Sequence, residues 1–173
     1  GTIFSVRGNS VATNGTRWVA VGSSTGAGDT ILTSTDGLTW SAILTGGFPN
    51  YSGQGVAWNG SRWIAVGQTV TGGDSTIQTS VNGINWTNTS GGFSGIGHGI
   101  AWNGSTWIAV GEDNTNTILL SANGLVWSRA TGSTFPYSGY GVASNNVWKT
   151  IPSTPQDASS EILKLLYSKF GLI

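Results

Sequence analysis

The residues of this sequence that are best suited to binding chemistry recur at one place, directly before a repeated apolar phrase. They are Asn9, Gln54, His98 and Tyr140, and the aromatic residues Tyr51, Phe93 and Tyr137 occur on the connections nearby. Aromatic rings stack on the apolar faces of sugars, while amide, imidazole and phenol groups hydrogen-bond to hydroxyls. These seven residues are therefore candidate contacts for a carbohydrate or protein ligand, although the same aromatic side chains would also serve to anchor loops on a core.

The sequence offers little for catalysis. Asp29, Asp74 and Asp113 fall in three separate loops, which places them too far apart to act as a pair of glycosidase carboxylates. The chain has no cysteine, so a thiol nucleophile and a zinc–thiolate site are excluded. Glu112 and Asp113 are adjacent, but one acidic pair is a weak basis for a metal site. We therefore expect a protein that is not an enzyme, with no catalytic residue, no bound metal and no cofactor.

An internal repeat positions the candidate residues. A phrase that contains Ala-x-Asn-Gly and then Trp before a short apolar run occurs at 10–22, 55–67 and 99–111, and a degraded copy begins at 141. A second phrase, which ends in Trp, occurs at 34–40, 80–86 and 121–127. Repeats of about 40 to 50 residues are typical of propellers and solenoids.

Each repeat predicts four short antiparallel strands. Asn-Gly in the first phrase predicts a tight type I′ hairpin turn, and Asp-Gly or Asn-Gly in the second phrase predicts another turn. The expected strands are 11–12, 17–21, 30–34 and 38–44 in the first repeat, 56–58, 62–66, 76–80 and 84–89 in the second, and 100–102, 106–110, 117–121 and 125–130 in the third. The partial fourth repeat predicts two further strands, at 141–144 and 147–151. Residues 1–9 could add a lone strand. In strand 17–21, Trp18 and Ala20 share one face, and Val19 and Val21 share the other.

The predicted fold class is all-β, a β-propeller of four-stranded antiparallel blades with three full repeats and a partial fourth. Tryptophans of both phrases would fill the space between blades. The blades are expected at about 10–50, 51–94, 95–136 and 137–151. Residues 152–173 are expected to form a linker that contains proline and a short C-terminal amphipathic helix over 157–171. The apolar stripe of this helix, the candidate partner-docking surface, is Ile162, Leu165, Leu166 and Phe170.

The second phrase resembles the Asp-box, or BNR, repeat of sialidase-like and photosystem-assembly-factor-like propellers, whose motif runs Ser-x-Asp-x-Gly-x-Thr-Trp. Ser34, Asp36, Gly37 and Trp40 match it in kind, as do the corresponding residues of the other two copies. One residue between Asp and Gly is missing in every copy, and Asn replaces Asp twice. The resemblance implies a propeller in which the Asp or Asn side chain bonds its own turn. It implies little about function.

Strand order predicts that the tight turns of all repeats lie on one face of the disc and the long loops on the other. Function usually belongs to long loops on a rigid scaffold, so binding is expected on the long-loop face. Acidic and basic residues balance at seven each and only 8% of residues are charged, which argues against a nucleic-acid partner. The sequence contains no apolar stretch of about 18 residues, so membrane insertion is not expected. A composition rich in Gly, Ser, Thr and Asn favours an extracellular, cell-surface or virion setting.

Three full repeats and a partial fourth do not obviously close a ring, because propellers have about four to eight blades. Two copies of the chain could complete one ring of about seven blades, or the chain could be a segment of a longer propeller. A distorted four-bladed ring could also take residues 1–6 into its last blade. For function, two alternatives are expected. The chain is a recognition module for carbohydrate or protein, or it is an assembly subunit of a virion, fibre or engineered oligomer. The assembly subunit would complete its ring with itself or dock through the C-terminal helix.

Overall fold

The computed structural model describes residues 4–25, 29–70, 72–114, 116–132 and 135–144, and this part of the chain is all-β. Its one helical element is the short 3-10 turn η1 (Asp74–Thr76). Within these ranges, no helix has the length and apolar character needed to span a membrane. The expected helix at 157–171 with its stripe Ile162, Leu165, Leu166 and Phe170, and the strand expected at the end of the partial fourth repeat, lie outside the described residues.

In the described part of the chain, twelve strands follow one another in three sets of four. The first set is β1 (Arg7–Thr13), β2 (Trp18–Ser23), β3 (Ile31–Ser34) and β4 (Ser41–Ala42). The second set is β5 (Ser52–Trp58), β6 (Trp63–Gln68), β7 (Ile77–Ser80) and β8 (Thr87–Asn88). The third set is β9 (Gly97–Trp102), β10 (Trp107–Gly111), β11 (Ile118–Ser121) and β12 (Ser128–Arg129).

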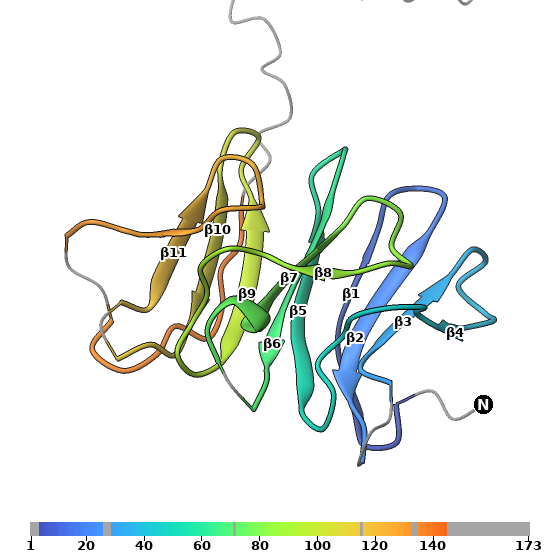
Figure 1. Ribbon diagram of the computed structural model, residues 1–173. Coiled ribbons are helices and arrows are strands. Elements are labelled where there is room, and N and C mark those ends of the chain that lie inside the picture. The colour runs from blue at the N-terminus through green and yellow to red at the C-terminus, as the bar shows by residue number, and fades with distance from the viewer. Residues whose placement is uncertain (1–3, 26–28, 71, 115, 133–134, 145–173) are drawn as a thin grey trace, which may run out of the picture.

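Each set is an antiparallel meander, in which every strand pairs with the next one along the chain. One strand-residue pair, Ser23 with Ser52, joins the first meander to the second. Figure 1 shows the three meanders side by side as a fan, from blue through green to orange, with the β1–β2, β5–β6 and β9–β10 hairpin ends along one edge. This arrangement is consistent with a β-propeller-like fold.

The apolar core lies between successive meanders. One buried cluster joins Val19, Val21 and Ile31 of the first meander to Val56, Trp63, Ala65 and Trp86 of the second. The next cluster joins Ile64, Val66 and Ile77 of the second meander to Ile100, Trp107, Ala109, Leu119 and Trp127 of the third. Strand β6 therefore presents Trp63 and Ala65 to the meander before it and Ile64 and Val66 to the meander after it. In β2, Val19 and Val21 are buried against the second meander while Trp18 and Ala20 are more exposed, which confirms the predicted alternation along 17–21.

The Asn-Gly turns within the first repeated phrase differ from the predicted type I′ geometry. Gly15 has a φ of 91°, but Asn14 is not in the positive-φ region. Asn14 instead uses its side chain, because Oδ1 accepts hydrogen bonds from the Thr16 and Arg17 backbone N–H groups. The loop consequently spans four residues between the paired Thr13 and Trp18. The two later repeats show the same bonds at Asn59 and Asn103.

The second phrase folds into a hydrogen-bonded turn in all three repeats. In the first, Asp36 Oδ1 accepts bonds from the Leu38 and Thr39 N–H groups, and Ser34 Oγ accepts one from the Gly37 N–H. Asn82 and Asn123 make the equivalent bonds with a neutral amide oxygen. The prediction that these three side chains bond their own turn is confirmed.

Several expected strand boundaries were wrong, for local reasons. The last strand of each repeat is only two residues long, because the preceding residues are held in the turn just described. Residues 7–9 are no lone strand, since they belong to β1, in which Arg7 and Gly8 pair with Ser23 and Gly22. Residues 141–144 form no strand, although Ser144 Oγ donates to the Trp102 carbonyl beside β9.

Candidate functional site

The candidate residues Asn9, Gln54 and His98 share one backbone feature, a β-bulge. In β1 the pairing register shifts between Gly8 and Ser10, so that Asn9 is the extra residue. Corresponding shifts occur around Gln54 in β5 and around His98 in β9. A bulge leaves one residue out of the ladder and re-aims its side chain, and bulges are frequent beside binding sites. The position that stood out in the sequence is thus a recurring irregularity of the first strand of each meander.

Side-chain hydrogen bonds hold the first two of these bulges, at Asn9 and Gln54. The Asn9 side-chain amide donates to the Gly53 carbonyl at 2.7 Å, next to Gln54. The Gln54 amide donates to Ser52 Oγ at 2.7 Å within its own strand. Both side chains are partly buried, and these bonds occupy one amide donor of each. Asn9 therefore joins β1 to β5, whereas Gln54 stabilises the bulge of its own strand.

His98 and Tyr140 come together in the third repeat. Their ring centroids are 4.9 Å apart, and the ring planes are tilted by 38°. His98 Nε2 lies 3.5 Å from Glu112 Oε1, and it makes no hydrogen bond to any described residue. Tyr140 is 74% exposed, whereas the His98 side chain is 15% exposed. The imidazole thus supports an exposed tyrosine ring from beneath.

Backbone bonds hold three segments together around this pair. The Glu112 N–H donates to the Ile96 carbonyl at 2.7 Å, and the Gly95 N–H donates to the Glu112 carbonyl at 3.1 Å. On the other side, Glu112 forms a bridge with Ser138. The Gly139 N–H donates to the Gly111 carbonyl. The loop after β10 is therefore clamped between the connections that precede β9 and follow β12.

These three segments enclose a pocket of about 410 Å³ on the long-loop face. Its lining residues are Ser94, Gly95, Glu112, Asp113, Asn114, Tyr137, Ser138 and Tyr140. The lining combines two exposed phenol rings, two carboxylates, an amide and two hydroxyls. We call it the acidic pocket.

Asp113 stabilises the wall of the acidic pocket. Its side chain is 1% exposed and lies 3.4 Å from Arg129 Nη2. Ser94 Oγ donates to Asp113 Oδ1 at 3.3 Å and accepts a bond from the Asn114 N–H at 3.2 Å. Glu112, at 43% exposed, is the more accessible of the two carboxylates. Chemically, Asp113 fixes the loop, and Glu112 is available to a ligand.

Two other candidates do not line this pocket. Phe93 is fully buried in the core cluster between the second and third meanders, so it anchors the connection from inside and faces no ligand. Tyr51 is partly buried, and its backbone N–H donates to the Phe48 carbonyl in the connection before β5. Of the seven residues chosen from the sequence, Tyr137 and Tyr140 line the acidic pocket and His98 contacts Tyr140.

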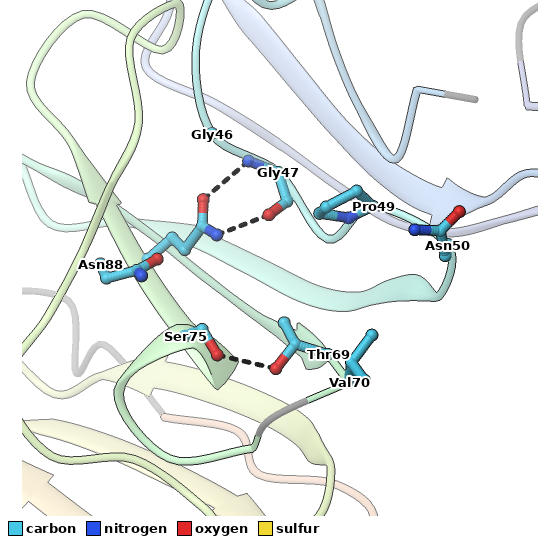
Figure 2. Close-up of a pocket in the computed structure, with 9 residues that line it drawn as sticks. Gly46, Gly47, Pro49, Asn50, Thr69, Val70, Ser75 and Asn88 are labelled. Carbon is cyan, nitrogen blue, oxygen red and sulfur yellow. Dashed lines mark hydrogen bonds between the residues drawn. The ribbon is translucent and has the colours of Figure 1, made fainter. Parts of the chain in front are cut away.

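A second pocket, of about 390 Å³, occupies the corresponding place between the first and second meanders, and we call it the neutral pocket. Its lining residues are Gly46, Gly47, Pro49, Asn50, Thr69, Val70, Ser75, Gln78 and Asn88, and none of them is charged. The Gln78 amide is hydrogen-bonded to the Gly47 backbone. Figure 2 shows the Thr69 and Ser75 hydroxyls bonded to each other. Thr69 and Val70 hold the positions that Asp113 and Asn114 hold in the third repeat.

Sequence reasoning missed Glu112, Asn114 and Ser94 as parts of the site. The signal was present in the loop after each repeated phrase, where Gln68-Thr69-Val70 of the second repeat becomes Glu112-Asp113-Asn114 in the third. Among the described residues, no three His, Cys, Asp or Glu side chains cluster as metal ligands would. No protein-family model matches the chain. No curated protein sequence matches it either.

Proposed function

We propose that the three meanders are blades of a β-propeller and that the chain is a non-catalytic carbohydrate-binding module. The sugar occupies the acidic pocket. The observation that carries the proposal is the pairing of two highly exposed tyrosines, Tyr137 at 84% and Tyr140 at 74%, with an accessible carboxylate at Glu112. The hydrogen-bonded turns at Asp36, Asn82 and Asn123 support the resemblance to Asp-box propellers.

The lining side chains offer different contacts to a bound sugar. Tyr137 and Tyr140 offer ring faces for the apolar face of a sugar, since exposed aromatic rings bury a large area when a ligand covers them. Glu112 can accept hydrogen bonds from hydroxyls, and Asn114 can both donate and accept. Asp113 is held by Ser94 and Arg129, so the loop that carries Glu112 and Asn114 is fixed before a ligand arrives.

A glycan array probed with the whole chain tests this proposal, followed by calorimetry with the best glycan found. Tyr137→Ala and Tyr140→Ala should each weaken binding by about tenfold, because each removes a stacking surface. Glu112→Gln should weaken binding less, since the amide keeps the shape of the carboxylate and loses its charge. These side chains are largely exposed, so the free energy of unfolding of each variant should lie within about 0.5 kcal/mol of that of the parent.

Two matched controls come from outside the acidic pocket. Val70→Ala changes the neutral pocket at the position equivalent to Asn114, and Tyr51→Ala removes a tyrosine from another connection. Neither should change glycan binding. Absence of binding to every glycan would refute the proposal, and a protein ligand lost with Tyr137→Ala would move the same pocket to protein recognition.

A further inference from the structure

The chain contains five Asn-Gly dipeptides, and the fold places them in two kinds of turn. Asn14, Asn59 and Asn103 begin the turns at the ends of the β1–β2, β5–β6 and β9–β10 hairpins, which we call the hairpin turns. Asn82 and Asn123 begin the turns of the second repeated phrase, which we call the packed turns. Because the dipeptide is the same in both, a difference in its chemistry must come from its surroundings.

In both kinds of turn, hydrogen-bond donors surround the oxygen of the asparagine side chain. Asn59 Oδ1 accepts bonds from the Ser61 and Arg62 N–H groups at 2.9 and 2.8 Å and from the Ser61 hydroxyl at 3.1 Å. Asn82 Oδ1 likewise accepts bonds from two backbone N–H groups and one hydroxyl. Donors placed in this way stabilise the negative charge that develops on a carbonyl oxygen when a nucleophile adds to its carbon. The side-chain carbonyl is therefore activated in both kinds of turn.

The two kinds of turn differ at the backbone nitrogen of the glycine. In the packed turns this nitrogen is bonded, since the Gly83 N–H donates to Ser80 Oγ at 2.8 Å and Gly124 makes the equivalent bond. In two of the hairpin turns it is free, because the N–H groups of Gly60 and Gly104 make no hydrogen bond to any described residue. Only in these hairpin turns can the nitrogen change partner without breaking a bond.

Packing separates the same glycines. Gly83 and Gly124 are buried, and a Cβ on Gly124 would lie 2.9 Å from Ile64 Cδ1 of the preceding meander. Gly60 and Gly104 are exposed, and a Cβ on either would meet nothing within 4 Å. The hairpin ends project along one edge of the fan in Figure 1. The backbone of a hairpin turn can therefore reorient, whereas the neighbouring meander holds a packed turn in place.

We propose that Asn59 and Asn103 are sites of spontaneous deamidation in the folded protein. At the first site, the Gly60 nitrogen loses its proton to solvent base and forms a bond to Asn59 Cγ. The side-chain nitrogen takes up a proton and leaves as ammonia, so that a succinimide ring remains. Water then adds across one of the two C–N bonds of the ring, which gives aspartate or isoaspartate. In sum, one side-chain amide and one water become one carboxylate and one ammonium ion.

The third hairpin turn, at Asn14, is expected to react more slowly. Its glycine nitrogen is bonded, because the Gly15 N–H donates to Thr13 Oγ1 at 3.1 Å. Tryptophan takes the place of Thr13 in the two later repeats and offers no such acceptor. Like the other hairpin glycines, Gly15 is exposed and a Cβ on it would meet nothing within 4 Å. This turn therefore separates the effect of the hydrogen bond from the effect of packing.

The two products differ in what they do to the turn. Aspartate keeps the side-chain acceptor, as Asp36 does in its own turn. Isoaspartate routes the main chain through the former side-chain carbonyl, so the acceptor of the Ser61 and Arg62 bonds is displaced. Since the formal net charge of the chain is zero, each event makes the chain negative, and the new charge lies at the hairpin edge.

The experiment incubates the whole chain at mildly alkaline pH and follows each Asn-Gly dipeptide by peptide mass mapping, which detects the replacement of NH₂ by OH. In the folded protein, Asn59 and Asn103 should react about tenfold faster than the packed turns, because a bonded and buried glycine raises the barrier. A parallel sample in urea is the control, since unfolding removes the differences in surroundings. The five rates should converge there.

A matched pair of variants tests the hydrogen bond alone. Thr13→Ala frees the Gly15 N–H and should raise the rate at Asn14 by about threefold, because one exposed bond is lost. Thr13→Ser keeps the hydroxyl and should react as the parent does. Thr13 is exposed, so both variants should remain folded.

Three results would overturn the proposal. The first is an equal rate in hairpin and packed turns of the folded protein, which would show that neither the bond nor the packing of the glycine controls the reaction. The second is the same ranking in urea, which would assign it to the flanking residues. The third is a folded protein that reacts at no hairpin turn although the urea sample reacts, which would show that these turns hold the glycine nitrogen away from Cγ.

Discussion

Trp18 and Trp63 occupy the same place in successive repeats, yet Trp63 is fully buried and Trp18 is 39% exposed. The strands that carry them are alike, since β2 and β6 each pair with a strand on either side in the same register. Two neighbours make the difference: Trp63 has a preceding meander, which Trp18 lacks among the described residues, and Trp63 also packs against Trp58, where Trp18 has Thr13. The comparison teaches that each four-stranded unit is incomplete by itself and takes half of its core from a neighbour.

The same contrast extends to the turn of the second phrase. A Cβ on Gly83 would lie 2.9 Å from Arg17 Cδ and 3.0 Å from Val19 Cγ2, both on the preceding meander. A Cβ on Gly37 would meet nothing closer than Trp18 Nε1 at 3.6 Å. The turn therefore caps its own repeat in the first case and packs into an interface in the second. Substitutions at equivalent positions of the two repeats can separate the two roles.

The largest expected effect is at the tryptophans. Trp63→Ala should lower the free energy of unfolding by about 3–5 kcal/mol, because it opens a cavity in the interface between two meanders. Trp18→Ala should cost about 1–2 kcal/mol in a single chain, since part of this indole is already in water. Urea unfolding at protein concentrations too low for self-association measures both. Equal losses would mean that Trp18 is covered in a single chain as fully as Trp63 is.

An intermediate effect is expected at the turn glycines. Gly37 and Gly83 have φ values of 74° and 72°, so an alanine at either position carries the same backbone strain of about 1 kcal/mol. Gly83→Ala should cost roughly 1–3 kcal/mol more than Gly37→Ala, because its methyl group must displace Val19 and Arg17. The difference in unfolding free energy isolates the packing of the turn against the preceding meander. Identical losses at the two glycines would contradict that packing.

The smallest expected effect is the pH dependence of the first turn. Hydrogen bonds from the Thr39 and Leu38 N–H groups and from the Ser34 hydroxyl lower the pKa of Asp36 from 3.8 to about 2. The folded state thus favours the ionised carboxylate, and the resulting stability is present above the unfolded pKa and is lost as the pH falls through about 2. Asn82 and Asn123 hold equivalent turns without a titrating group.

Unfolding of the parent and of Asp36→Asn between pH 5 and pH 1.5 measures this contribution. The free energy of unfolding of the parent minus that of Asp36→Asn should decrease as the pH falls through this window, and it changes sign if the variant becomes the more stable protein. A gap that stays constant with pH would show that the Asp36 carboxylate gains nothing from its turn.

Local features of the fold were predictable from residue types. The Asp36, Asn82 and Asn123 turns follow from short side chains that bond the backbone two and three residues ahead. The alternation along Trp18, Val19, Ala20 and Val21 follows from the two-residue period of a strand. The tight-turn geometry was mistaken because Asn14 has two ways to make a turn, and its side chain bonds the backbone where a positive φ was expected.

The candidate site was only partly predictable. The recurrence of Asn9, Gln54, His98 and Tyr140 was visible in the sequence, but the bulges at the first three depend on how many residues face each other across two strands. Phe93 and Tyr137 read alike as aromatic residues on connections, and one is buried while the other is 84% exposed. Glu112 joined the site because its loop is clamped between two other connections, which no single segment specifies.

The sequence by itself determined the repeat, the all-β character, the faces of the middle strands and the bonded turns, because each depends on residues close together in the chain. Only the tertiary structure decided which copies of a repeated residue are covered and which are open. The physical reason is that a side chain on the face of one meander is buried only when a neighbouring meander covers it. Trp18, Trp63 and Trp107 hold the same position of the repeat, but Trp63 and Trp107 each have a preceding meander and a tryptophan on the paired strand, whereas Trp18 lies opposite Thr13 and has no preceding meander among the described residues.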